Sequence, residues 1–89
     1  MVSIKEIIKV DADKNIIYCL FTNNELRYVD LTKIIKEHPD SKMINRLRHK
    51  IFFGKVKLDT YGTLVWPNEL DFCPDVLFAW SKPYTKDDL

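Results

Sequence analysis

Ile16-Ile17-Tyr18-Cys19-Leu20-Phe21 is the stretch that decides the fold. Its six residues are apolar without interruption and begin with two β-branched side chains, which is typical of a strand covered on both faces. It is also the longest uncharged apolar run, and it is far shorter than the about 20 residues that a membrane-spanning helix needs. The sequence therefore predicts a central strand inside a soluble domain.

Two further strands are expected beside this one. Residues 2–10 alternate imperfectly, and the adjacent apolar pair Ile7-Ile8 indicates a bulge. Residues 11–15 form the turn into the central strand. After it, Asn23-Asn24 can adopt the left-handed backbone of a tight hairpin, and residues 25–30 return with alternating polarity. The N-terminal third is thus predicted to be a three-stranded antiparallel meander.

Two short helices are expected next. Asp30 is positioned to cap the first, which Pro39 ends, and Asp40 or Ser41 is positioned to cap the second. The spacing of apolar residues gives each helix one inward face. The side chains predicted to point inward are Leu31, Ile34, Ile35, Met43, Ile44, Leu47, Phe52 and Phe53.

The C-terminal part predicts a hairpin and a last helical turn. Residues 55–59 and 63–66 flank a turn in which Gly62 supplies a permissive backbone, and Pro67 ends the second strand. Pro74 begins a helical turn carrying Val76, Leu77 and Trp80, and from residue 82 the chain is polar. We expect a small single α+β domain over residues 1–81, with an antiparallel sheet of about five strands, and a frayed polar tail over residues 82–89.

Composition limits the possible classes of protein. The 89 residues suffice for one domain, and 46% apolar and 12% aromatic residues suffice for a core without disulfides or metal. This excludes a disordered chain and an enzyme with a separate cofactor domain. The formal net charge is +1, so no overall field marks a nucleic-acid or membrane binder.

Cysteine and histidine spacing predicts no metal site. Cys19 and Cys73 lie far apart in apolar surroundings, and we expect two buried, reduced thiols. Neither cysteine stands at ligand spacing with His38 or His49, so we expect neither a metal nor a cofactor. The N-terminal residues contain no basic region followed by an apolar run, which predicts a cytoplasmic protein without a signal peptide.

The run Gly62-Thr63-Leu64-Val65-Trp66-Pro67-Asn68-Glu69-Leu70-Asp71-Phe72-Cys73-Pro74-Asp75-Val76-Leu77 resembles the C-terminal signature of a bacterial domain-of-unknown-function family, DUF2442. The turn after Phe21-Thr22, the strand ending at Asp30-Leu31 and the segment 52–59 resemble the same family. The likeness covers about residues 3–78. Asn23-Asn24 and Asn68-Glu69 depart from the family's usual glycine-containing turns. The signature residues are Gly62, Trp66, Pro67, Asp71, Pro74, Asp75 and Leu77.

The resemblance implies a compact α+β domain. In larger members this domain precedes a helix-turn-helix, and we expect no DNA binding by that route here because the sequence ends before such a segment. Genes of the family often lie beside a second small reading frame, in an arrangement that resembles a toxin–antitoxin pair. The resemblance therefore implies a small protein partner.

The carboxylates near the signature could in principle serve catalysis. A small hydrolase would use Asp59 or Asp71 with His49 as a base. Each carboxylate also has a structural explanation, because Asp59 begins a turn, Asp71 can bond a loop backbone, and Asp75 follows Pro74 in a first helical turn. Since no catalytic motif accompanies them, the sequence favours a protein that is not an enzyme.

Positive charge is concentrated in one segment. Residues 41–58 contain six basic residues and no acidic one, whereas residues 59–89 have a net charge of −4. This segment could contact nucleic acid or an acidic protein, or it could be a solvated surface. The basic residues are Lys42, Arg46, Arg48, Lys50, Lys55 and Lys57.

Two tryptophans leave a similar choice open. Trp66 and Trp80 are either core residues or interface anchors, since tryptophan is enriched among binding hot spots. We expect a non-enzymatic interaction or regulatory module, with an antitoxin-like partnership with a neighbouring small protein as its specific form. Nucleic-acid binding through residues 42–57 is the first alternative, and the hydrolase is the second.

Overall fold

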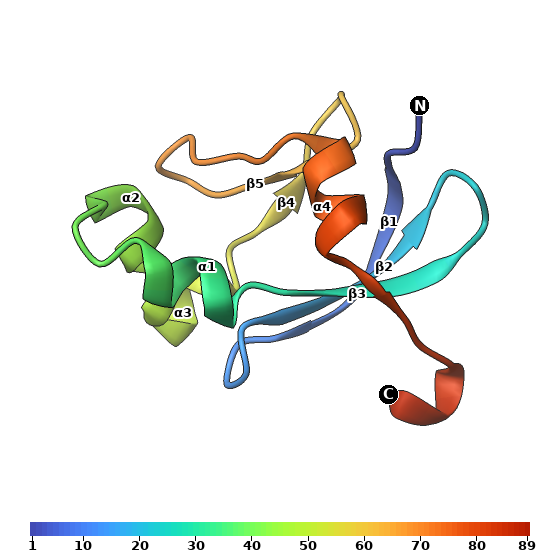
Figure 1. Ribbon diagram of the computed structural model, residues 1–89, viewed down its shortest axis with the longest axis horizontal. Coiled ribbons are helices and arrows are strands. Elements are labelled where there is room, and N and C mark those ends of the chain that lie inside the picture. The colour runs from blue at the N-terminus through green and yellow to red at the C-terminus, as the bar shows by residue number, and fades with distance from the viewer.

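The computed structural model describes residues 1–89 and has an antiparallel four-stranded sheet in the order β1-β2-β3-β6. These strands are β1 (Ile4–Asp11), β2 (Ile16–Phe21), β3 (Leu26–Asp30) and β6 (Lys82–Pro83), and a second sheet pairs β4 (Lys57–Leu58) with β5 (Leu64–Val65) (Figure 1). The helical elements are α1 (Thr32–Glu37), α2 (Lys42–Asn45), the 3-10 turn η1 (Arg46–Arg48), α3 (Lys50–Phe53), α4 (Pro74–Trp80) and the 3-10 turn η2 (Lys86–Asp88). The α+β prediction is confirmed.

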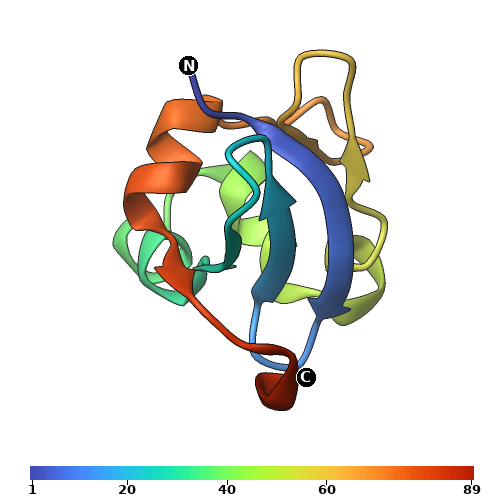
Figure 2. The same ribbon diagram turned by 90° about the vertical axis from the view of Figure 1, so that its right-hand side faces the viewer.

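The strand β2 lies between β1 and β3, as predicted. Its side chains alternate, with Ile17, Cys19 and Phe21 fully buried and the three others half-buried. Figure 2 shows the reason, because the helices lie behind the sheet and leave its near face more open. On that open face the Tyr84 ring packs edge-on against Tyr18, with ring centroids 5.0 Å apart. The prediction that β2 is covered on both faces is therefore wrong for the face that carries Tyr18.

Strand β1 carries the predicted bulge. Its register against β2 shifts between Ile7 and Lys9, and again between Ile4 and Glu6. Each shift leaves one residue without a cross-strand partner, and the extra residue at the first, Ile8, is 37% exposed. An unpaired residue rotates the following side chains, which explains why simple alternation fails in this strand.

The second predicted helix is divided. The Ser41 hydroxyl caps α2 by accepting a hydrogen bond from the Ile44 backbone N–H at 3.3 Å, in agreement with the sequence. At His49 the backbone is extended, so the helix stops and α3 starts anew. Met43 was predicted to point inward and is 43% exposed instead. Adjacent residues are about 100° apart on a helix, and the inward face here belongs to Ile44 and Leu47.

The hairpin β4–β5 does not extend the main sheet, so the expected single sheet of about five strands was wrong. The hairpin instead approaches the start of β1, where the Ile4 N–H donates to the Gly62 carbonyl at 2.8 Å. Gly62 has a φ of 76°, and a Cβ atom there would lie 2.7 Å from the Ser3 Cβ. Glycine is therefore required at this turn for its backbone and for its size.

Residues 82–89, which the sequence predicts as a frayed tail, lie against the main sheet in the structure. Lys82 and Pro83 pair with β3, and the Tyr84 N–H donates to the Leu26 carbonyl at 3.1 Å. Tyr84 is only 7% exposed, and a capping box between Thr85 and Asp88 ends the chain. The segment looks polar in sequence, but its one aromatic ring has a docking place on the open face of the sheet.

The core joins the hairpin to the helices through Trp66. This residue is 2% exposed, and its ring lies 5.7 Å from that of Phe53 and 6.0 Å from that of Phe72. The core interpretation of Trp66 is thereby confirmed. Of the two free thiols, Cys19 is buried as predicted, whereas Cys73 is exposed because it immediately precedes α4 at the surface. None of the helices is both long and apolar enough to cross a membrane.

Candidate functional site

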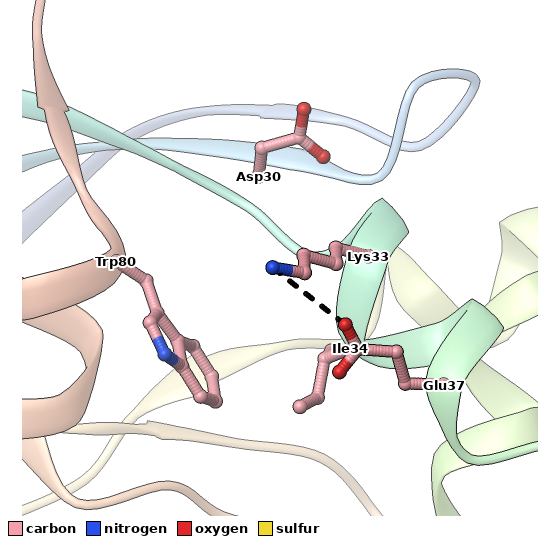
Figure 3. Close-up of a pocket in the computed structure, with 5 residues that line it drawn as sticks. All are labelled: Asp30, Lys33, Ile34, Glu37 and Trp80. Atoms are coloured by element: carbon pink, nitrogen blue, oxygen red, sulfur yellow. Dashed lines mark ion pairs between the residues drawn. The ribbon is translucent and has the colours of Figure 1, made fainter.

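A groove lies between α1 and the C-terminal end of α4. Its volume is about 240 Å³, and it is lined by Asp30, Lys33, Ile34, Glu37 and Trp80 (Figure 3). Trp80 is 38% exposed, and its buried side packs edge-on against Phe72 at 5.8 Å between ring centroids. The groove thus presents an accessible indole opposite an apolar helix residue, with charged groups at its rim.

The junction between α4 and β6 fixes where Trp80 stands. Ser81 directly follows Trp80 and accepts two hydrogen bonds from Arg27 on β3. The Arg27 Nε donates to the Ser81 hydroxyl at 2.6 Å, and its Nη2 donates to the Ser81 carbonyl at 3.0 Å. The same guanidinium lies 4.7 Å from the centre of the Phe78 ring. These contacts hold the end of α4 against the sheet, so the position of the indole is set by the fold and not by a loop.

Charges of both signs surround the indole. Lys33 and Glu37 form an ion pair of 3.7 Å along α1, and the Asp30 carboxylate accepts the Thr32 backbone N–H at 2.9 Å. A wider, adjoining hollow includes Lys36 and Lys82. The rim carries both positive and negative charges. The groove therefore suits an apolar side chain surrounded by polar groups better than a strongly charged ligand.

The six basic residues are all exposed, and two of them also make contacts within the protein. Lys50 pairs with Asp13 at 2.5 Å, and the hydrogen bond and charge of Lys50 lower the pKa of the Asp13 carboxyl. Arg48 is used within the fold, since it donates to the Asn45 side-chain oxygen at 2.5 Å and to the Ile35 carbonyl at 3.3 Å. The predicted basic patch therefore loses two members to internal contacts.

The other four basic residues divide into two pairs. Lys42 and Arg46 line one shallow hollow together with Asn45 and His49. Lys55 and Lys57 line another, whose remaining residues are Val65, Trp66 and Pro67. Four of the six residues of the predicted basic patch thus line two hollows that have no residue in common.

The residues considered for hydrolysis lie on different elements. The Asp59 carboxylate accepts the backbone N–H groups of Tyr61 at 2.9 Å and of Thr63 at 3.1 Å, which is the turn role proposed from the sequence. His49 immediately precedes α3, whereas Asp59 follows β4 at the start of the β4–β5 turn, and these two elements lie apart in Figure 1. Asp71 is exposed and forms an isolated bridge with Val65. No three His, Cys, Asp or Glu side chains are placed to hold a metal ion.

The comparison with protein families decides the family. The family described as "Protein of unknown function (DUF2442)" matches residues 7–83 of the 89-residue chain. The chain belongs to the DUF2442 family. This confirms the resemblance carried by residues 62–77. No curated protein and no solved structure matches the chain significantly.

The signature residues of this DUF2442 chain make structural contacts. Pro74 is in the first turn of α4 and Asp75 supplies its only acidic residue there, which suits the positive end of the helix dipole. Leu77 is fully buried. Before the helix, the Thr63 hydroxyl donates to the Phe72 carbonyl. The backbone N–H of Trp66 donates to the Leu70 carbonyl at 2.9 Å. The signature therefore explains the fold of DUF2442 around Trp66.

The groove itself was not predicted for this DUF2442 domain. The sequence singled out Trp80 as core or interface, but Ile34 was expected to be an ordinary inward residue of the first helix. Residues 30–37 and 80 meet only because β6 and β3 bring the end of α4 alongside α1. The one available signal was a tryptophan at the end of a short, proline-initiated helix.

Proposed function

We propose that this DUF2442 protein is a non-catalytic interaction module that binds a small partner protein at the groove between α1 and α4. The observation that carries the proposal is the half-exposed indole of Trp80, which is held in place by the Arg27–Ser81 contacts. Tryptophan is among the residues that contribute most to protein interfaces. A fixed aromatic side chain also loses little conformational freedom on binding.

The shape of the groove supports a protein partner. Its volume is about 240 Å³, and it opens into the adjoining hollow of about 560 Å³ that shares Trp80. It can accept one large side chain against Trp80 and Ile34. The charged residues around it would then form the polar rim that surrounds the buried centre of an interface.

The partner we propose is the product of a neighbouring small reading frame in a bacterial genome, with this chain in an antitoxin-like or regulatory role. The family resemblance supports this choice. A cytoplasmic location fits the two free thiols of Cys19 and Cys73, because disulfides are the rule in oxidising compartments.

The experiment is co-expression of this protein with the product of the adjacent reading frame, followed by size-exclusion chromatography. We expect co-elution at micromolar concentration and its loss in Trp80→Ala. Tyr61→Ala is the matched control, because Tyr61 is an aromatic residue that is 83% exposed at the distant β4–β5 turn. Separate elution of the two parent proteins, or equal loss in both variants, would refute the proposal.

A second candidate function is nucleic-acid binding through residues 42–57. Its support is the exposure of all six basic side chains of that segment. If this function is correct, the affinity for nucleic acid falls steeply with salt concentration. Removing the charge of Lys42 and removing that of Lys57 should each lower this affinity. Fluorescence anisotropy with single-stranded and duplex oligonucleotides at increasing salt tests it, and salt-insensitive or absent binding would eliminate it.

A further inference from the structure

The hollow beside α2 is lined by residues of polar or basic type. Lys42, Asn45, Arg46 and His49 surround a space of about 290 Å³, and no acidic residue lines it. Lys42, Asn45 and Arg46 stand at positions i, i+3 and i+4 of the helical turns α2 and η1, which brings their side chains to one face, and His49 follows at the extended residue that ends η1. Ile44 and Leu47 pack into the core instead. Four side chains that can form hydrogen bonds thus line the hollow.

Arg46 is held by an aromatic support. Its guanidinium lies 4.2 Å from the centre of the Phe52 ring, and Phe52 is only 7% exposed. A cation over an aromatic face is stabilised, and stacking leaves the N–H groups at the edge of the guanidinium free to donate. None of the three ion pairs in the structure involves Arg46 or Lys42. Both charges therefore remain open to an external anion.

Asn45 is oriented by its neighbour Arg48. The Arg48 Nε donates to the Asn45 side-chain oxygen at 2.5 Å, while its Nη2 donates to the Ile35 carbonyl at 3.3 Å. With its oxygen engaged, the Asn45 amide has its NH₂ group left, and this group can only donate. Arg48 thus acts as a positioning residue that fixes Asn45 as a donor.

We propose that Lys42, Asn45, Arg46 and His49 form a binding site for a phosphate monoester. A monoester carries up to two negative charges on three terminal oxygens, and charge-assisted hydrogen bonds from Arg and Lys are the strongest that such a group receives. The proposal is independent of the function proposed for the groove at Trp80, since the two sites share no residue.

The arrangement of charge favours one compact phosphate over the backbone of a polynucleotide. Binding along a chain of phosphodiesters requires a continuous basic track. Here Lys50 is paired with Asp13, and Arg48 is used inside the fold. Lys55 and Lys57 belong to a different hollow. The hollow at Arg46 and the hollow at Lys55 and Lys57 share no lining residue, which favours recognition of one compact phosphate.

The test is titration of the ¹⁵N-labelled full-length protein with inorganic phosphate and with O-phosphoserine, followed by ¹H–¹⁵N correlation spectra. We expect saturable shifts confined to amides near residues 41–50 at millimolar ligand, and no such shifts with serine. Arg46→Gln and Lys42→Gln should each weaken binding about tenfold or more. Lys5→Gln, which removes the same charge from β1, should change it by less than about twofold.

Other outcomes would overturn the proposal. Equal weakening by Lys5→Gln and Arg46→Gln would show a non-specific response to net charge. Absence of saturable shifts at about 10 mM phosphate would show that no site exists. An oligonucleotide without a terminal phosphate that binds as tightly as the same oligonucleotide with a 5′-phosphate would show recognition of the phosphodiester backbone instead. Failure of co-elution in the partner experiment would leave this site unaffected.

Discussion

The indole Nε1 of Trp66 donates a hydrogen bond to the backbone carbonyl of Phe53 at 3.0 Å, inside the core. This bond links the residue after β5 to the last residue of α3, which lies 13 positions earlier in the chain. A buried carbonyl needs a partner, and here the largest apolar side chain of the core supplies it. Trp66 therefore satisfies both the packing and the polar requirements at this place.

Trp66→Ala should destabilise the protein by about 3–5 kcal/mol, because it leaves a large cavity between the hairpin and the helices. That loss is comparable with much of the total stability of a small domain. Urea unfolding followed by circular dichroism measures it. Trp66→Phe keeps an aromatic ring but removes the hydrogen bond, so it should cost less. A Trp66→Ala protein that unfolds like the parent would contradict the role assigned to the indole.

Gly62→Ala should destabilise the protein, because the backbone there is left-handed and the new methyl group would meet Ser3. The conformational part alone is about 1–2 kcal/mol. Gly54→Ala is the matched control, since its backbone is helical and the nearest atom to a new Cβ is 3.4 Å away. Adding Ser3→Gly to Gly62→Ala should restore part of the loss in thermal melts. Equal melting of the two glycine variants would be evidence against the contact.

Cys73 and Cys19 should differ sharply in reactivity towards a thiol reagent. Cys73 is exposed, while burial raises the pKa of the Cys19 thiol to about 12, so that almost no Cys19 thiolate exists at pH 8. We expect one thiol per native chain to react with Ellman's reagent and two to react in urea. Cys73→Ser should abolish the rapid native reaction. Rapid modification of both thiols in the native protein would contradict the buried position of Cys19.

The free energy of unfolding should decrease between about pH 9 and pH 12. In that window the unfolded chain has lost the Cys19 proton, because the ordinary thiol pKa is 9.0, while the native chain retains it. The native state then binds more protons than the unfolded state, so raising the pH favours unfolding. Burial also raises the pKa of Tyr84, which acts in the same direction. Cys19→Ala should show a shallower decrease in urea titrations across this range, and an unchanged slope would contradict the assignment.

Tyr84→Phe should leave the C-terminal segment docked and raise stability by up to about 1–2 kcal/mol. The Tyr84 hydroxyl is buried without a hydrogen-bond partner, and an unsatisfied buried hydroxyl costs free energy that phenylalanine does not incur. Tyr84→Ala should instead release residues 82–89 from β3. Amide hydrogen exchange at Tyr84 distinguishes the two, since its N–H donates to the Leu26 carbonyl. Retained protection in Tyr84→Ala would show that the ring does not hold the segment.

Local patterns were sufficient where neighbouring residues decide the structure. The central strand at residues 16–21, the bulge at Ile7-Ile8, the Ser41 cap and the turn at Asp59 depend on apolar runs, side-chain hydrogen bonds and glycine conformations within a few residues. These features are confirmed. Local patterns gave a wrong prediction at Met43. Helical spacing defines an apolar stripe, but it does not define which of two adjacent apolar residues lies at the centre of that stripe.

What the sequence by itself determined is the α+β class, the meander around Ile17 and the family; what only the tertiary structure decided is the burial of Trp66 and which distant surfaces meet. Pairing of Lys82 and Pro83 with β3 brings Trp80 beside α1 and creates the groove there. Contacts with distant residues also engage two members of the basic segment, Arg48 with Ile35 and Lys50 with Asp13. The physical reason is that local propensities act over a few residues, whereas these contacts depend on segments that the folded core alone brings together.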